Sequence, residues 1–300
     1  CLPQGQKIGA SLLPDLIDEI CAWHRKRVFV MESRKRADLA LGAALRTWLG
    51  WRRDNDDATN ARICDLASQL IKCGEKLTKG KPHPLSDTDE WKEYSDIIMA
   101  SILSRGAVDA MEKTATQHME ELARLLPVWS AFAEGVRGLG ARSLAVIVGE
   151  AGDLGQYATK SKLWKRMGLA VMDGVRQGGL AKNAGAEAWI QHGYNAKRRS
   201  QMFVIGDVLV KVGDHYRQVY LARKEFERAK AQAAGLTVAS AAKIPEKRKA
   251  EFVSDGHIHR RAQRYMEKRL LRDLWQAWRA TTGLTQRSRG AVPADYSESA

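Results

Sequence analysis

The stretch GVRGLGARSLAVIVGEAG, residues 135–152, joins a tight glycine turn to an apolar run. Gly138 and Gly140 flank Leu139, and the run from Leu144 to Val148 follows within a few residues. Glycine lets the backbone bend sharply and leaves its amide groups uncovered, because it has no Cβ. This order of residues is typical of two helices joined by a hairpin turn, the helix-hairpin-helix pattern.

The rest of the chain also has a helical pattern. Apolar residues recur at three- and four-residue spacing over 12–51, 57–77, 196–220 and 257–280. Alternating strand patterns are scarce, and the 300 residues include only seven prolines. The predicted fold class is therefore all-α, with a helical N-terminal region followed by a helical domain that contains the hairpin.

Three regions are predicted along the chain. Residues 1–134 form a helical region, with a coiled-coil hairpin as one arrangement, interrupted by a loop at 78–90 that contains glycine and proline. Residues 135–280 form the second domain, in which 229–251 is expected to be a linker or a frayed helix. The last segment, 281–300, is expected to be disordered because it is polar and has little apolar content.

The chain is strongly basic, with a formal net charge of +14. Residues 160–200 carry a net +7 and residues 257–279 a net +5, so most of the excess lies in two segments. Such a balance favours a polyanionic partner, of which nucleic acid is the commonest and an acidic membrane surface is the alternative. No apolar run is as long as a membrane helix requires, so a soluble, cytoplasmic protein of bacterial or phage origin is expected.

The glycine turn and the basic segments together suggest a phosphate site. Amides exposed at the turn and the positive end of the following helix would both favour a phosphate group. A plain turn between helices, and basic runs that only face solvent, are the alternatives. The predicted nucleic-acid-binding residues are Arg137, Gly138, Leu139, Gly140, Arg142, Lys162, Lys165, Arg166, Arg176, Lys197, Arg198, Arg199, Arg261, Arg264 and Lys268.

Several short motifs occur in the same order as in a known family. They are Gly138-Leu139-Gly140, Gly152-Asp153-Leu154 with Tyr157, Ser161-Lys162-Leu163-Trp164, Gly168-Leu169 and Val175-Arg176-Gln177. In this order, over about residues 135–280, the chain resembles the C-terminal domain of the DEDD-type, bridge-RNA-guided insertion-sequence transposases. The resemblance implies DNA binding in transposition and recombination, with a guide RNA as a further partner.

The departures from that family concern catalysis. The serine that the family implies for strand cleavage and joining falls at Gly178, and glycine has no nucleophile. The strands of a metal-binding acidic nuclease domain are not predicted before Gly135. The resemblance therefore leaves enzymatic activity open and predicts no catalytic residue. The chain is expected to be a fragment of a transposase or a relative that has lost catalysis.

Other reactive residues have simpler interpretations. Asp255, next to His257 and His259, is expected to cap a helix and not to bind a metal. Glu150 and Asp153 are likewise expected to cap loops. The four cysteines are scattered, so neither a metal site nor a disulfide is predicted, and no cofactor is expected.

Two tryptophans receive opposite predictions. Trp189 lies among polar residues and is the candidate for stacking on a base. Trp278 follows the apolar period of the last helix and is expected in the core.

The predicted function is that of a DNA-binding protein of a mobile element that holds the phosphate backbone. The alternative is a catalytically inactive phage or mobile-element accessory or scaffold protein. Self-association through the N-terminal helices is a further expectation, and the residues leave the preference between DNA and RNA open.

Overall fold

The computed structural model describes residues 12–172 and 174–283, and helices account for most of them. This confirms the predicted all-α class. The ten α-helices of the described residues are α1 (Leu13–Trp48), α2 (Asp57–Leu77), α3 (Asp89–Ser104), α4 (Gly106–Leu125), α5 (Ala141–Ala151), α6 (Lys160–Arg166), α7 (Ala186–His192), α8 (Ala196–Val212), α9 (His215–Ala233) and α10 (Asp255–Thr281). The segment 284–300, most of the predicted disordered tail, lies outside the described residues.

Two compact units divide the chain, and their bounds differ from the predicted regions. One unit comprises Arg25–Gln117, and the other comprises Cys1–His24 together with His118–Ala300. Residues at both ends of the predicted 1–134 region, such as Ile20 and Met119, belong to the same core cluster as the second half of the chain. This division could not be predicted from the sequence, because it depends on contacts between apolar residues that are about a hundred positions apart.

The unit 25–117 is built around a small core. The buried side chains of this core are Leu41, Leu45, Ala67, Leu70, Cys73, Trp91 and Ile98. Gly74 permits the close approach of α2 and α3, since a Cβ there would lie 2.6 Å from Ile102 Cδ1. Within this unit, Arg34 on α1 pairs with Glu112 on α4 at 2.7 Å.

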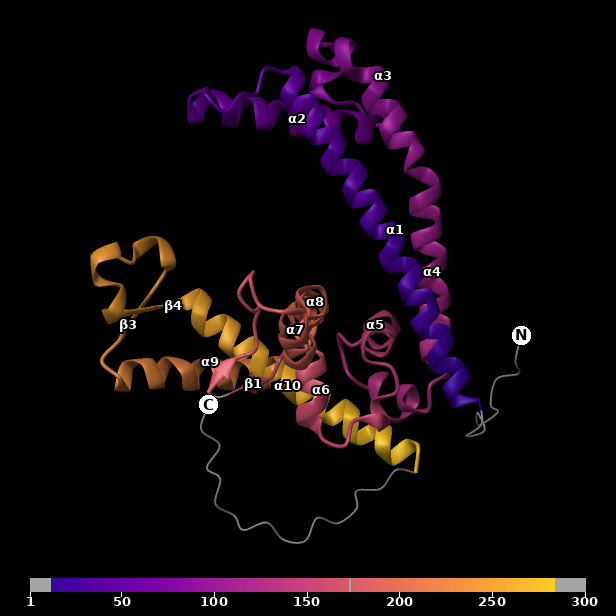
Figure 1. Cartoon of the computed structure of the whole chain (residues 1–300), viewed down its shortest axis with the longest axis vertical. Helices are drawn as coiled ribbons and strands as arrows, with labels where there is room; N and C mark the ends of the chain where they lie inside the picture. The colour runs from indigo at the N-terminus through magenta and orange to yellow at the C-terminus, as the bar shows by residue number, and fades with distance from the viewer. Residues whose placement is uncertain (1–11, 173, 284–300) are drawn as a thin grey trace. The chain divides into compact units, whose positions relative to one another are not determined.

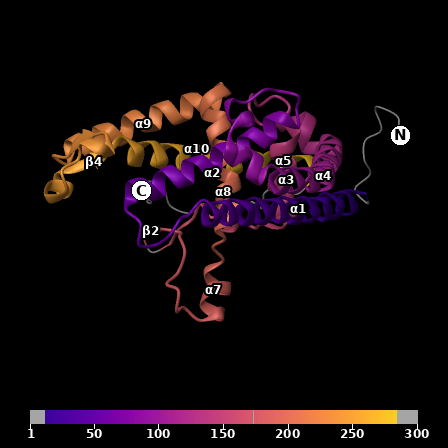
Figure 2. The same cartoon turned by 90° about the horizontal axis from the view of Figure 1, so that it is seen from above.

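The other unit is organised around α10, which packs along α9 and also contacts α8 and α6. Figures 1 and 2 both show α10 lying beside α9. One side of α10 is deeply buried, through Ile258, Ala262, Met266, Leu270, Leu274 and Trp278. Trp278 is 1% exposed, which confirms its predicted place in the core. Its indole Nε1 donates to Asp153 Oδ1 at 2.8 Å.

Two details of the helices correct the sequence interpretation. The single helix expected over 196–220 is two, since Gly213 adopts an extended conformation (φ −66°, ψ 155°) between α8 and α9. The cap of α10 is Ser254, whose side chain accepts from the amide of His257, and not Asp255. Asp255 instead pairs with Arg228 at 3.2 Å.

Strands are few and short. The strands β1 (Val171–Met172) and β2 (Val175–Arg176) form an antiparallel pair. The strands β3 (Thr237–Ala239) and β4 (Phe252–Ser254) form a parallel pair. The expected linker at 229–251 therefore has a defined structure: α9 continues to Ala233, and β3 follows it and pairs with the strand that precedes α10.

Within the described residues, no helix combines the length and the apolar character needed to cross a membrane.

Candidate nucleic-acid interface

A turn at Gly138 lies between a short π-helical segment (Trp129–Ala133) and α5, and half of this turn is packed against the protein. Gly138 has a φ of +94°, a backbone conformation that favours glycine. A Cβ at this position would lie 3.1 Å from Leu209 Cδ2 on α8. Leu139 is buried at 2% exposure, and its amide donates to the carbonyl of Val136 at 2.9 Å. These two residues therefore shape the turn and do not face solvent as freely as the sequence prediction required.

The other half of the turn is open. Gly140 is exposed and precedes the first turn of α5, and no side chain caps the helix there. A Cβ on Gly140 would meet nothing within 4 Å. The first amides of a helix have no acceptor within the helix, so they carry partial positive charge toward this open side.

Two arginines flank the turn, and they differ in their surroundings. Arg137 is exposed. Arg142 is also exposed, but its Nε donates to Glu120 Oε1 at 2.8 Å. Arg137 thus remains the stronger candidate for a phosphate beside Gly140.

A first group of predicted cations contacts Glu150, through its carboxylate or its main-chain carbonyl. Arg198, 9% exposed, donates from Nε to Glu150 Oε2 at 3.2 Å, and His24 Nε2 lies 3.0 Å from Glu150 Oε1. Arg166 donates to the Glu150 carbonyl at 3.0 Å. Burial opposes ionisation of the Glu150 carboxyl, but His24 and Arg198 outweigh it and lower its pKa. Arg198 is therefore a buried structural partner, and Glu150 holds this ion-pair group rather than capping a loop.

A second group surrounds Glu267, which is fully buried on α10. Arg199 Nη1 lies 3.0 Å from Glu267 Oε2. Arg264, on the same helix, donates to the carbonyl of Gly168 at 3.4 Å. Burial raises the pKa of Glu267 to about 7, although Arg199 and Arg264 act in the opposite direction. Arg199 and Arg264 are thus occupied, at least in part, by contacts within the protein.

Two of the predicted lysines, Lys165 and Lys268, also contact groups of the protein. Lys268 Nζ lies 5.2 Å from the centre of the Trp164 ring, and burial followed by repulsion from Arg264 lowers its pKa. Lys165 donates to the carbonyl of Gln191 at 2.9 Å. Both cations therefore contribute to packing as well as to charge.

The remaining predicted cations are exposed. They are Lys162, Arg176, Lys197 and Arg261. Arg261 is 3.3 Å from Glu227, and Lys197 also has an interaction within the protein. Arg176 lies on β2, in a segment that projects with α7 away from α9 and α10 in Figure 2.

The same segment contains the position of the family's serine. The carbonyl of Gly178 lies 2.7 Å from His192 Nε2, so this glycine has a structural contact in place of a nucleophile. Trp189 is partly exposed, and a Cβ on Gly179 would lie 3.7 Å from its ring. The geometry keeps Trp189 as a candidate for stacking.

The residues considered as metal ligands have other partners. Asp153 accepts from the amide of Gly155 at 2.8 Å, which confirms its predicted capping role. His259 Nδ1 lies 2.8 Å from the hydroxyl of Tyr220. Among residues 12–172 and 174–283, no group of three or more His, Cys, Asp or Glu side chains is placed to hold a metal ion.

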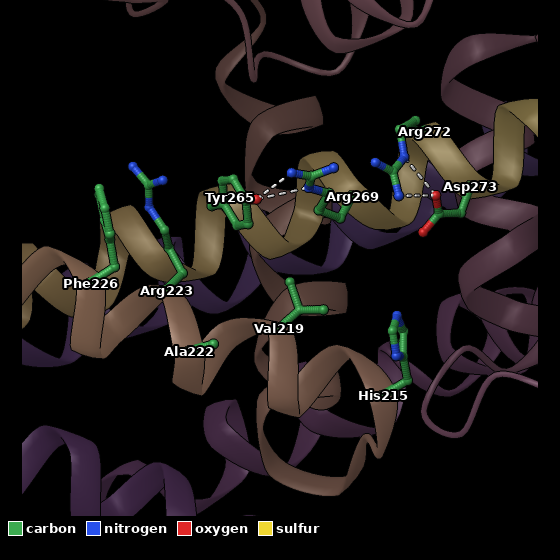
Figure 3. Close-up of a pocket in the computed structure, with 9 residues that line it drawn as sticks. All are labelled: His215, Val219, Ala222, Arg223, Phe226, Tyr265, Arg269, Arg272 and Asp273. Atoms are coloured by element: carbon green, nitrogen blue, oxygen red, sulfur yellow. Dashed lines mark hydrogen bonds and ion pairs between the residues drawn. The ribbon is translucent and has the colours of Figure 1, made fainter. Parts of the chain in front are cut away.

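The sequence interpretation missed a groove between α9 and α10, shown in Figure 3. It has a volume of about 470 Å³. Its lining residues are His215, Val219, Ala222, Arg223, Phe226, Tyr265, Arg269, Arg272 and Asp273. The sequence did contain part of the signal for this groove. Arg223 and Phe226 are three residues apart and Tyr265 and Arg269 are four apart, so each pair lies on one face of its helix. What the sequence lacked was the pairing of the two helices.

Comparisons of the chain with protein-family models, with curated proteins and with solved structures gave no match. The resemblance to the transposase domain therefore rests on the motifs alone.

Proposed function

We propose that this chain is a nucleic-acid-binding protein of a mobile element that holds DNA through its phosphate backbone. The interface comprises the open side of the turn at Gly140, Arg137, and the exposed cations between residues 160 and 200. A role in transposition or recombination comes with the motif resemblance, and a guide RNA is a further partner on the same ground.

The observation that carries the proposal is the exposure of cations between 160 and 200. Six of the nine basic residues of this segment are exposed, while its acidic residues are only Asp173 and Glu187. Clustered cations that face solvent attract a polyanion, whatever its sequence. The exposed six are Lys160, Lys162, Arg166, Arg176, Lys182 and Lys197.

Gly140 gives a local test, because its surroundings accept a side chain. Gly140→Asp would place a carboxylate at the cap of α5, where it satisfies an amide and repels phosphate. The variant loses a charge-assisted hydrogen bond from this amide to a phosphate. Its affinity for a random-sequence duplex is therefore expected to be about tenfold lower. Fluorescence anisotropy with a labelled duplex measures this affinity.

Two control variants isolate the charge. Gly140→Ala leaves the amides uncapped and should bind as the original chain does, while Gly140→Asn caps them without charge and should fall in between. Gly138 is unsuitable for this test, because its positive φ would strain any other residue. Equal affinities of the Asp and Ala variants would remove the turn from the interface.

A scaffold role is the second candidate, and exposed apolar side chains on the N-terminal helices favour it. Phe29 and Leu39 on α1, and Leu103 on α3, are each more than 60% exposed. Exposed apolar residues of this size are typical of protein contacts, and self-association of the N-terminal helices would cover them. Sedimentation of the full chain at several concentrations tests this: a monomer at all of them would oppose the scaffold role.

A further inference from the structure

The groove between α9 and α10 contains a ladder of guanidinium groups and aromatic rings. The Arg223 guanidinium carbon lies 4.6 Å from the ring centre of Phe226 and 4.7 Å from that of Tyr265. Arg269 lies 4.9 Å from the same tyrosine ring and donates to its hydroxyl, one of its two contacts being 3.0 Å long. Figure 3 shows these side chains along the two helices.

The arginines of this ladder all have partners within the protein. Glu227 pairs with Arg223 at 2.6 Å, and Asp273 pairs with Arg272 at 2.7 Å. The first pair lies within α9 and the second within α10, so each holds its guanidinium group in place on its own helix. Phe226, however, is 54% exposed, although a phenyl ring that served only to join the helices would be more stable in the core.

The lining of the groove has an excess of positive charge. Its lining includes three arginines and a single carboxylate, Asp273, which also accepts from the hydroxyl of Tyr216 at 2.9 Å. An exposed ring beside several guanidinium groups suits a ligand that has both a flat aromatic part and a negative charge.

We infer that this groove binds an unpaired nucleic-acid strand, with a base stacked on Phe226 and the adjoining phosphates held by Arg269 and Arg272. Every base has a flat face, so the stacking is independent of sequence. A duplex keeps its bases stacked on one another, so it offers this groove only its backbone. The inference rests on the proposed nucleic-acid-binding function, and it assigns a surface and a strand state which that function does not include.

The test measures the affinity of the full chain for two labelled single strands of equal length. One is dT15, and the other has abasic sites in place of the bases. The original chain is expected to bind dT15 roughly tenfold more tightly, since base stacking on aromatic residues is worth that much or more. Phe226→Ala should abolish this difference in affinity, and Phe226→Tyr, which keeps an aromatic ring, should retain it. Arg269→Gln should reduce the salt slope for dT15 by about 0.7, the value for one phosphate contact on a single strand.

Duplex affinity, measured on the same variants, separates this inference from the proposed function. Phe226→Ala with unchanged duplex binding and lost dT15 preference supports the groove. Equal binding of dT15 and the abasic strand by the original chain, with duplex binding intact, overturns the groove and leaves the proposed function standing. Absence of binding to every probe overturns both.

Discussion

Two carboxylates, Glu150 partly buried and Glu267 fully buried, decide how several of the predicted cations are used. Glu150 lies with His24 and Arg198, and Glu267 lies with Arg199 beside Arg264. A buried ionised carboxylate is costly without a cation, so each needs its arginine for stability. An arginine that supports the core in this way is less available to a phosphate than an exposed lysine.

The raised pKa of Glu267 predicts a pH-dependent stability. Its folded pKa of about 7 exceeds the ordinary 4.5, so the folded state holds its proton more tightly than the unfolded state does. The stability gained from that proton is complete below about pH 4.5 and is lost as the pH rises toward 7. Glu267→Gln removes this titration.

The measurement is the thermal midpoint of both proteins between pH 5 and pH 8. The midpoint of the original chain should fall relative to that of Glu267→Gln as the pH rises. Parallel curves for the two proteins would show that the carboxyl does not titrate in this window.

At the level of elements, α10 is the helix around which its unit is organised, and its start is fixed by one hydroxyl. Ser254 accepts from the amide of His257 at 3.2 Å, and the strand β4 ends at the same residue. The pairing of β3 with β4 therefore positions the start of α10 beside the end of α9. Since the arginines of the groove are divided between α9 and α10, the groove depends on this alignment.

Loss of the Ser254 hydroxyl should loosen that start. Ser254→Ala is expected to cost about 0.5–2 kcal/mol, the usual range for an N-cap. Ser254→Thr keeps a hydroxyl and suits the strand, so it should retain most of the stability. Thermal unfolding, followed by circular dichroism, compares the stability of the three proteins. An Ala variant as stable as the original chain would show that the Ser254 hydroxyl does not stabilise the start of α10.

For the whole molecule, the net charge of +14 matters less than where the exposed part of it lies. If residues 160–200 contact phosphates, they should contribute more to binding than an equal charge elsewhere. Neutralising Lys160, Lys162 and Arg176 to glutamine should lower the salt slope for duplex DNA by about 2.7, from about 0.9 for each contact.

A matched triple variant removes the same charge from the other unit. Lys72, Lys79 and Lys81 are also exposed, and their change to glutamine should leave the slope nearly unchanged. The slopes come from duplex affinities measured at a series of salt concentrations. Equal reductions in the two triple variants would mean that net charge alone drives binding, and an interface at 160–200 would be wrong.

Some of the fold could be predicted because its signals are local. The helix expected over 57–77 has those bounds as α2, since its apolar residues are periodic and Asp56 caps its start. Trp278 was placed in the core from its spacing alone. The break at Gly213 and the cap at Ser254 were missed, because a serine or glycine inside a favourable pattern acquires its role only from the conformation of its neighbours.

The candidate site was less predictable than the fold. The sequence located basic segments and a glycine turn, but it could not separate Arg198, buried against Glu150, from Lys197 beside it, which is exposed. It also gave no reason to join Arg223 with Tyr265, which lie 42 positions apart.

The amino-acid order by itself determined the helical class, most helix positions and the excess of positive charge, because periodicity, capping and composition act over a few residues. The tertiary structure alone decided which cations are bound to carboxylates within the protein, which side of the turn at Gly140 is open, and that an arginine and aromatic groove forms between α9 and α10. These features depend on contacts between residues far apart in the chain, and such contacts are set by how the helices pack and not by the pattern within any one of them.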